Sequence, residues 1–558
     1  MTNVAIDFFE KHKSFLEQGL NVAQSREYWS AYPEIPSGKI YGETAKSDGK
    51  AVFDGYLNKQ FDLPSHPADA YIGAESSPYG FDLGISYPTS NTENLVAASK
   101  AASKDWAKAS IEERIGVALE ILSRLNKRSF EMANAVTHTT GQAFMMAFQA
   151  GGPHAQDRAL EAVVYAYQAM KNTPTNATWS KPAGKDKVDH IEKTWRILPR
   201  GIALEIGCAT FPTWNGYPGL FASLVCGNTV IVKPHPNAIL PLAITIAIGR
   251  DVLSEAGFNP NTLILAADTQ DAPITKDLAT NPDIKIIGFT GSNAFAQWLK
   301  ENATQAQIYT EEAGVNSIVI DSTDNFRAMC GNIAFSLSLY SGQMCTAPQN
   351  IYVPSGGIET EDGHKSFDEI AMGIQKATDG LLKDPERAAG VCGALVNDQV
   401  MTRLTTMQNA GQVLRQTTTI GGLENARTAT PHIMMVDDAD TGPHTQECFG
   451  PISFIVKAED TSAAIKSAAT LAATKGAITA AIYSQNEAVI DEAAEAFGEA
   501  GVNLSCNLTG GIFVNQSAAF SDYHVTGANP AGNASLTDLA FVANRFRVVA
   551  VRKPINPA

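Results

Sequence analysis

The sequence predicts an α/β fold built around two open parallel sheets. Short apolar runs of four to six residues, such as NTVIVKP and IKIIGFTG, alternate with helical patterns between residues 195 and 513. Buried strands separated by helices are typical of βαβ units in a parallel sheet. A second α/β stretch begins near Asn316, and a chain of 558 residues is long enough to bury both cores.

The elements before this region are mainly helical. Residues 1–75 mix loops with an amphipathic helical pattern at the N-terminus. Two helices are expected between Thr92 and Val136, the second opened by a capping box at Ser110 and Glu113. Another helix is expected over residues 157–171. The polar segment 172–187 carries almost no core residues and predicts a protruding connector.

The α/β region and the C-terminus follow in order. Strands are expected in 194–207, 228–234, 261–267, 284–291 and 317–321, with helices after Leu240, after Gly291 and over 461–474. The last 45 residues return to a strand-like pattern that ends in FVANRFRVVAVR. No internal repeat and no low-complexity tract is present in the sequence.

Composition and charge exclude several classes of protein. The chain is 44% hydrophobic and 18% charged, which excludes wholesale disorder, and its net charge of −16 argues against nucleic-acid binding. Seven cysteines without a CxxC spacing predict neither a disulfide framework nor a metal site. The longest apolar stretch, 238–248, is too short to span a bilayer and contains Pro241. We therefore expect a cytoplasmic protein without a membrane partner.

One cysteine is a candidate nucleophile. Cys345 lies in SGQMCTAPQN, where small and polar residues surround it. A lone cysteine is usually a buried hydrophobe, but these neighbours are unusual for core filler. A thiol here acts as a nucleophile if a base or a local field favours the thiolate.

Four further segments carry candidate chemistry. Adjacent carboxylates, Glu311 and Glu312, stand at the mouth of a buried strand, where burial is costly unless one is used or solvated. Asn215 is expected in a rigid Pro/Trp/Gly turn before a helix, and a fixed amide suits an oxyanion. The segment of Asn215 also places Lys233 at the end of a strand. Gly291 and Ser292 lie at a strand-to-helix junction, a position that suits phosphate. The last segment, QECFGPISF, contains Glu447 and Phe449 and by itself indicates only a turn.

Order, spacing and context of these five segments resemble the aldehyde dehydrogenase superfamily over about residues 80–550. The resemblance implies that Cys345, in GQMCT, is the nucleophile, and that Glu311, 34 residues earlier, is the general base. PTWNGYP is similar to the family's PWNFP motif with two inserted residues, which implies that Asn215 is the oxyanion amide. Glu312 remains a rival base, because the usual Glu-Leu-Gly-Gly is Glu-Glu-Ala-Gly here.

The resemblance also implies a nicotinamide cofactor, NADP or NAD, and no metal. Lys233 would contact the ribose, Gly291 and Ser292 the diphosphate, and Glu447 with Phe449 the nicotinamide ribose. Pro236 replaces a carboxylate that commonly grips the adenosine ribose of NAD, so NADP becomes at least as plausible.

The domain organisation follows from the same resemblance. It implies an N-terminal extension (1–75), a cofactor-binding domain (76–171 and 200–310), a catalytic domain (311–525) and a β oligomerisation arm (172–199 and 526–558). A homodimer or homotetramer is expected from the arm.

The N-terminal extension and the segment AAFSDYHVTGANPAGNAS, in place of the usual PFGG substrate loop, resemble the phenylacetic acid degradation (PaaN-type) branch. That branch implies a semialdehyde substrate carried as a coenzyme A thioester. Two alternatives stay open: a CoA-acylating aldehyde dehydrogenase, and a catalytically silent homologue that binds nucleotide or acyl-CoA. Glu311 favours hydrolysis over transfer to CoA, and the joint presence of cysteine, amide and carboxylate argues against a silent protein.

Overall fold

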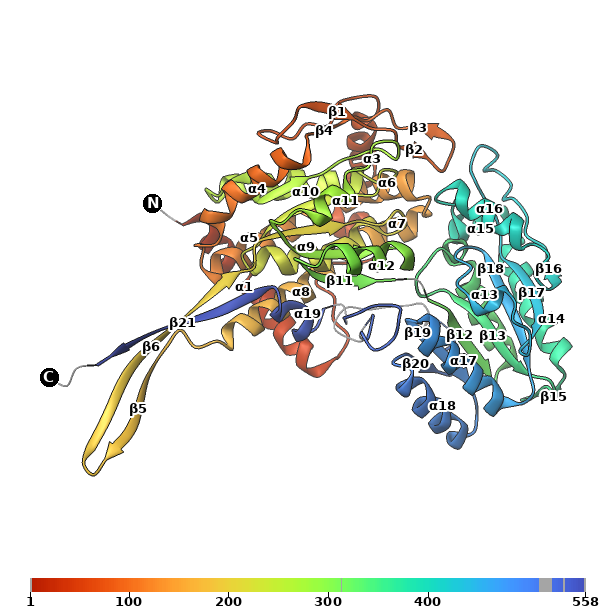
Figure 1. The fold of residues 1–558 in the computed structure, drawn as a ribbon. Helices are drawn as coiled ribbons and strands as arrows, with labels where there is room; N and C mark the ends of the chain where they lie inside the picture. The colour runs from red at the N-terminus through yellow and green to blue at the C-terminus, as the bar shows by residue number, and fades with distance from the viewer. Residues whose placement is uncertain (1–2, 313, 511–523, 535–536, 556–558) are drawn as a thin grey trace.

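The computed structural model describes residues 3–312, 314–510, 524–534 and 537–555. Two lobes lie side by side, and a thin β arm extends from the first of them (Figure 1). Each lobe is built on its own sheet, as the sequence predicts. Among the described residues, no helix is long and apolar enough to cross a membrane.

The first lobe is built on a five-stranded parallel sheet. Its order is β11 (Gln307–Glu311), β10 (Ile284–Thr290), β7 (Ile202–Ile206), β8 (Thr229–Lys233) and β9 (Leu263–Leu265). Its helices are α4 (Thr92–Trp106), α5 (Ile111–Lys127), α6 (Ser129–Thr140), α7 (Phe144–Gly151), α8 (Pro153–Lys171), α9 (Pro212–Val225), α10 (Leu240–Glu255), α11 (Thr275–Thr280) and α12 (Asn293–Asn302). The central strands β7 and β8 are buried along their whole length, because helices cover both faces.

The second lobe is built on a seven-stranded sheet that is parallel except for one edge strand. Its order is β16 (Gln412–Arg415), β17 (His432–Asp437), β18 (Ile452–Ala458), β13 (Pro348–Pro354), β12 (Asn316–Ile320), β19 (Thr479–Tyr483) and β20 (Asn503–Cys506). Its helices are α13 (Phe326–Ser338), α14 (Phe367–Leu382), α15 (Pro385–Cys392), α16 (Asp398–Met407), α17 (Thr461–Lys475) and α18 (Glu487–Glu499). Only β16 pairs antiparallel, with β17.

The N-terminal segment is part of the first lobe's core. Helix α1 (Val4–Ser25) packs against α5 and α8 and buries Phe8, Phe9 and Leu16. Two short helices, α2 (Gly38–Tyr41) and α3 (Ala45–Tyr56), follow it, and small hairpins β1–β4 (Ala70–Ile72, Ser76–Ser77, Phe81–Asp82, Tyr87–Thr89) complete the segment. The predicted capping box is present at the start of α5, where Ser110 and Glu113 bond reciprocally.

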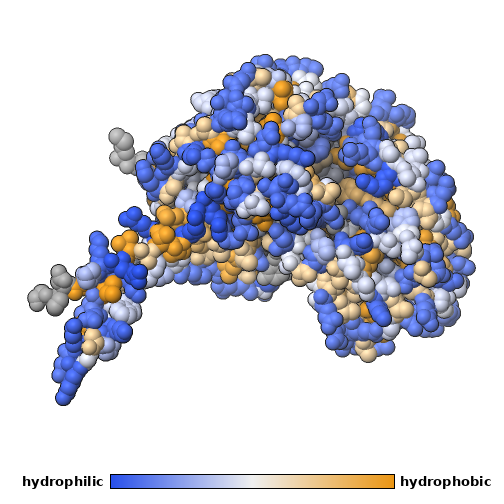
Figure 2. Space-filling view, in the orientation of Figure 1, coloured by the Kyte–Doolittle hydropathy of each residue, from blue (hydrophilic) through white to orange (hydrophobic). Residues whose placement is uncertain are grey.

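The arm is a three-stranded antiparallel sheet. The segment predicted to protrude, 172–187, lies in this arm (Figure 1), in which residues 176–184 and 187–199 form the strands β5 and β6. The C-terminal strand β21 (Phe546–Pro554) pairs with β6. The sequence predicts strand for FVANRFRVVAVR, and this is wrong for its first residues, which lie in the short helix α19 (Leu539–Ala543) before β21 begins. Apolar side chains lie exposed along the arm (Figure 2).

Candidate active site

The loop before Cys345 has an unusual backbone conformation. Tyr340, Ser341 and Gly342 have φ angles of 50°, 51° and 66°, in the left-handed region that non-glycine residues rarely adopt. A Cβ on Gly342 would lie 2.5 Å from the carbonyl oxygen of Gly450, so glycine is required there. Such conformations cluster at functional sites, where the surrounding structure enforces them.

Hydrogen bonds from two buried side chains hold this loop. The Gln343 amide donates to the carbonyl of Ala394 (3.1 Å) and accepts from the backbone N–H of Val396 (2.9 Å). The Asn316 amide nitrogen, at the start of β12, donates to the carbonyl of Cys345 (2.8 Å). The backbone at the candidate nucleophile is therefore tied to the second sheet.

Four polar side chains meet at the predicted nucleophile. The Cys345 sulfur lies 3.5 Å from Nε2 of His524, and the same nitrogen lies 3.1 Å from Oε1 of Glu311. The Asn215 amide nitrogen donates to Oε2 of Glu311 at 3.3 Å. The structure thus brings the three predicted catalytic residues together and adds His524, which the sequence reasoning missed.

Burial and charge set the protonation of this cluster. Burial, and then the nearby negative charge of Glu311, raise the pKa of the Cys345 thiol well above its ordinary value. Burial acts to raise the pKa of Glu311 as well. The charge of His524 and hydrogen bonds from His524 and Cys345 outweigh it, so the pKa of this carboxyl lies below its ordinary value.

Asn215 lies in the first turn of α9 and not in a turn before a helix, so that prediction is wrong. Pro212 occupies the first position of α9, where its missing N–H costs no hydrogen bond. The Asn215 side chain is buried, and its Oδ1 has no hydrogen-bond partner among the described residues. The helix fixes this amide beside the candidate nucleophile.

The two adjacent carboxylates point to different partners, and neither is solvated. Glu311 ends β11 and faces His524 and Asn215. Glu312 bonds to the Lys300 ammonium of α12 and accepts from the Thr310 hydroxyl. The next residue, Ala313, lies outside the described residues, as do residues 511–523 and 535–536 of the catalytic and arm regions, which include part of the predicted substrate loop.

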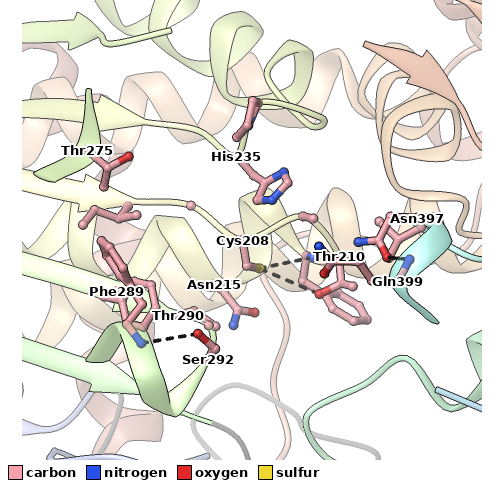
Figure 3. A pocket seen from close by; sticks show the side chains of 18 of the residues that line it. Cys208, Thr210, Asn215, His235, Thr275, Phe289, Thr290, Ser292, Asn397 and Gln399 are labelled. Atoms are coloured by element: carbon pink, nitrogen blue, oxygen red, sulfur yellow. Dashed lines mark hydrogen bonds between the residues drawn. The ribbon is translucent and has the colours of Figure 1, made fainter. Parts of the chain in front are cut away.

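Every predicted cofactor residue lines a cavity of about 490 Å³. Figure 3 shows part of this lining, with Ser292 and Asn215 labelled. The cavity lies at the carboxyl ends of the first sheet's strands, where ligands bind in open α/β sheets. Its lining includes Lys233, Gly291, Ser292, Glu447, Phe449 and Cys345. Ser292 caps α12 by accepting from the Phe295 N–H, so the start of a ten-residue helix faces the cavity.

The donors in this cavity fit a nicotinamide dinucleotide. Lys233 pairs with Asp268 at 2.5 Å, and both are buried beside the strand ends, where they suit a ribose. The α12 N-terminus suits a diphosphate. Glu447 lies near the thiol, and burial raises its pKa to about 7. The Arg403 guanidinium donates to the carbonyl of Phe449 at 2.6 Å and positions that loop.

A second cavity of about 470 Å³ meets the first at Cys345. Phe211, Asn215 and Cys345 line both cavities. The second is mainly apolar, and its walls include Met145, Met146, Trp214, Phe335 and Leu339. The thiol therefore stands between the cavity lined by the predicted cofactor residues and a mainly apolar one.

The comparisons with known proteins agree with this arrangement. The model of the aldehyde dehydrogenase family matches residues 86–527. This chain belongs to the aldehyde dehydrogenase family. A solved structure from Burkholderia multivorans, described as an NAD-dependent aldehyde dehydrogenase, is 55% identical, covers 99% of both chains and has a TM-score of 0.96.

More distant relatives match this chain by sequence. A 1-pyrroline-5-carboxylate dehydrogenase from Bacillus subtilis is 24% identical over 78% of this chain and 81% of its own length. A sulfoacetaldehyde dehydrogenase from Neptuniibacter caesariensis is 22% identical over 73% and 84%. The predicted fold, enzyme class and nicotinamide cofactor are thus confirmed at the level of the family.

Sequence reasoning missed three residues of this site. His524 stands inside the segment that replaces the usual substrate loop, and its departure from the family pattern was the available signal. Cys208 lines the cofactor cavity and lies close enough to raise the pKa of Cys345 further, after burial and Glu311. Asp268 follows a buried strand but belongs to no motif.

Proposed function

We propose that this enzyme oxidises a semialdehyde to the carboxylic acid through a covalent intermediate on Cys345. The position of Cys345 in the wall of both cavities carries the proposal, because the same thiol can reach an aldehyde on one side and a nicotinamide on the other. Asn215 and Glu311 complete the set of groups that such a reaction needs.

The residues divide the reaction into two halves. The Cys345 thiolate adds to the aldehyde carbon, and the Asn215 amide with the Cys345 backbone N–H holds the resulting oxyanion. A nicotinamide held by the residues of the first cavity would supply the hydride acceptor for oxidation of the thiohemiacetal to the thioester. Glu311 then takes a proton from water, which attacks the thioester and releases the acid and the thiolate.

Hydrolysis is favoured over transfer to free coenzyme A. Glu311 is buried, and His524, 3.1 Å away, helps to hold the pKa of this carboxyl below its ordinary value. An ionised carboxylate beside the thiol suits a base that activates water. A CoA-acylating enzyme would need water to be excluded at this step. A silent homologue would have no need for the cluster at Cys345.

The apolar cavity supports a substrate with a long hydrocarbon portion. Among the described lining residues, His154 pairs with Glu34 at 2.6 Å and His524 lies 3.1 Å from Glu311, so these leave no unpaired cation for an amino acid carboxylate. This favours the semialdehyde of ring-opened phenylacetate, carried as a CoA thioester, over the substrate class named for the 1-pyrroline-5-carboxylate dehydrogenases.

We propose NAD as the main cofactor, with NADP also accepted. The 55% identical relative is described as NAD-dependent, and Asp268 neutralises Lys233 at the ribose end of the cavity. Pro236 removes one carboxylate that would repel a 2′-phosphate, and His235 stands beside it in the cavity lining.

The predicted domains and the arm are part of the same proposal. We keep the division into 1–75, 76–171 with 200–310, 311–525, and the arm 172–199 with 526–558. Strand pairing between β6 and β21 joins the two arm segments, and exposed valines on β21 support pairing with a second copy. A homodimer or homotetramer is the expected assembly.

The test is a substrate screen with NAD and NADP, read by absorbance of the reduced cofactor. Acyl-CoA semialdehydes and medium-chain aldehydes should react with higher kcat/KM than glutamate semialdehyde. Identification of the product by mass spectrometry should give the free acid. A preference for glutamate semialdehyde would refute the proposed substrate class, and an acyl-CoA formed from free CoA would refute hydrolysis.

A further inference from the structure

We propose that His524 is a catalytic residue, whose Nε2 accepts the Cys345 thiol proton as the sulfur attacks the aldehyde. The inference rests on the proposed function, in which Cys345 is the nucleophile. It assigns a role to a side chain that no motif of the family resemblance includes.

The geometry places one nitrogen between the thiol and the carboxylate. Nε2 of His524 is 3.5 Å from the Cys345 sulfur and 3.1 Å from Oε1 of Glu311, and the three reactive atoms all lie within 4.8 Å of one another. In the neutral ring with the proton on Nδ1, Nε2 accepts from the thiol. The charged ring that lowers the pKa of Glu311 is the state after this transfer. After transfer, the new Nε2–H donates to the Glu311 carboxylate.

The bonds balance in this exchange. The S–H bond of Cys345 breaks, its proton binds Nε2, and the sulfur electron pair forms the bond to the carbonyl carbon. The carbonyl oxygen takes the negative charge and is held by Asn215. In the second half, water gives its proton to Glu311, and the C–S bond breaks to return the thiolate, which the imidazolium again stabilises.

A cation at His524 would stabilise the cluster when both of its acids are ionised. A thiolate at Cys345 and the Glu311 carboxylate would place two negative charges within 4.8 Å in a buried site. An imidazolium between them converts this repulsion into two attractive pairs. Other titratable or charged groups face the cluster from neighbouring elements: Cys208, Glu447, Arg158, Glu34 and His154.

The protein holds the imidazole ring in place. The edge of Trp214 contacts it, with ring centroids 4.6 Å apart at 72°, and Arg158 lies 5.2 Å from the centroid of the Trp214 ring. The side chain of His524 is 2% exposed. A ring fixed by packing is suited to repeated proton transfer at one atom.

The backbone after His524 is tied to the strand that carries Glu311. Glu312 N–H donates to the carbonyl of Ala531 at 2.6 Å, and Thr310 N–H donates to the Asn533 side chain at 2.9 Å. The Asn529 amide donates to the carbonyls of Ala477 (2.9 Å) and Gly501 (2.8 Å) in the second lobe. The segment thus fixes His524 relative to Glu311.

The experiment measures thiolate formation without cofactor or turnover. The apoenzyme, His524→Gln, His524→Ala and the exposed control His364→Gln are alkylated with iodoacetamide from pH 5.5 to 9.5. Peptide mass spectrometry separates modification of Cys345 from that of Cys208, which lines the same cavity. Circular dichroism and thermal melting verify that each variant is folded.

We expect the apparent pKa of Cys345 alkylation to rise by about one to two units in His524→Gln. At pH 7 the alkylation rate of this variant should be at least about ten-fold below that of the wild type. Added imidazole should restore part of the rate in His524→Ala, which a merely structural role would not explain. An unchanged pH profile in folded His524→Gln would overturn the inference. Activity of Cys345→Ala, measured alongside, separates this failure from failure of the proposed function, since an active alanine variant would refute the nucleophile itself.

Discussion

The amide nitrogen of Asn215 lies 3.3 Å from a carboxylate oxygen of Glu311, so the proposed oxyanion donor is hydrogen-bonded to the proposed base. A primary amide carries two N–H groups, and one bond to Glu311 leaves the other for a substrate oxygen. One side chain therefore orients the base of the second half-reaction while it serves the first.

The nucleophile gives the most direct prediction. Cys345→Ala should lower dehydrogenase and esterase turnover by at least about 10³-fold, because the covalent route is lost. Cys506→Ala, in which the removed thiol is exposed on β20, should keep wild-type activity. Steady-state rates and a thermal melt of each variant form the measurement. An alanine variant at position 345 that retained more than a few per cent of activity would disprove the assignment.

The two carboxylates should behave differently. Glu311→Gln should keep acylation and give a burst of about one reduced cofactor per site, followed by turnover slowed about 10²-fold. Glu312→Gln should turn over at a near wild-type rate but melt at a lower temperature, because Lys300 loses its buried partner. Rapid mixing records both traces. Reversed phenotypes would show that the base is Glu312.

The residue at position 236 should influence the choice of cofactor. Pro236→Glu should weaken NADP relative to NAD by about ten-fold, equivalent to ~1.4 kcal/mol, through repulsion with the 2′-phosphate. Pro236→Gln, of similar size without charge, is the matched control. Fluorescence titration of both cofactors gives the ratio of Kd values. An equal loss of both cofactors in the glutamate variant would contradict the electrostatic reason.

Glu205, a buried carboxyl on strand β7 of the first sheet, should make the stability of the protein depend on pH. Burial raises the pKa of Glu205 to about 8, so the folded protein holds a proton that the unfolded chain releases above its ordinary pKa of 4.5. The stabilisation is complete below that value and is lost as pH rises towards 8, by up to about 1.4 kcal/mol per unit. Glycines at 219 and 288 leave the room that this side chain fills, since a Cβ at either would collide with it.

Glu205→Gln should therefore remove this pH dependence. The melting temperature of the variant should rise relative to the wild type between pH 5.5 and pH 8, while the exposed control Glu492→Gln should follow the wild type at every pH. Parallel curves for Glu205→Gln and the wild type would mean that Glu205 is ionised when folded.

The arm should be needed for assembly. The Val549→Asp/Val551→Asp double variant puts charge on one face of β21, where both valines are about 40% exposed, and should shift the protein to a smaller species. Ala550→Asp, on the opposite face of the same strand, is the control. Light scattering after size-exclusion chromatography gives the mass. An unchanged mass in the double variant would argue against pairing through that face.

Local sequence patterns predicted much of the fold and the site. Continuous apolar runs predict buried strands such as β8. Glu311 ends β11 and Cys345 lies in the loop before β13, and the fold brings the two side chains to one site. The family resemblance supplied their roles. Asn215 lies beside Glu311 but in a helix and not in the predicted turn, because prolines indicate turns while Pro212 here begins a helix.

What the sequence could not show depends on long-range contacts. His524 is 179 residues from Cys345 and 213 from Glu311 along the chain, and no local period links them. The pairing of Glu312 with Lys300 follows from the packing of α12 beside β11, which a strand pattern does not reveal. Such partners are fixed by tertiary structure alone.

The meeting of two cavities at one thiol also sets the order of events during turnover. In the proposed function, substrate and dinucleotide would occupy different cavities that meet at Cys345, so departure of one need not displace the other. On that proposal, a reduced cofactor would leave while the acyl group stays attached, and the vacated volume would then admit the water that Glu311 activates. The cofactor cavity would then exchange its contents within one turnover, while the apolar cavity keeps the acyl group.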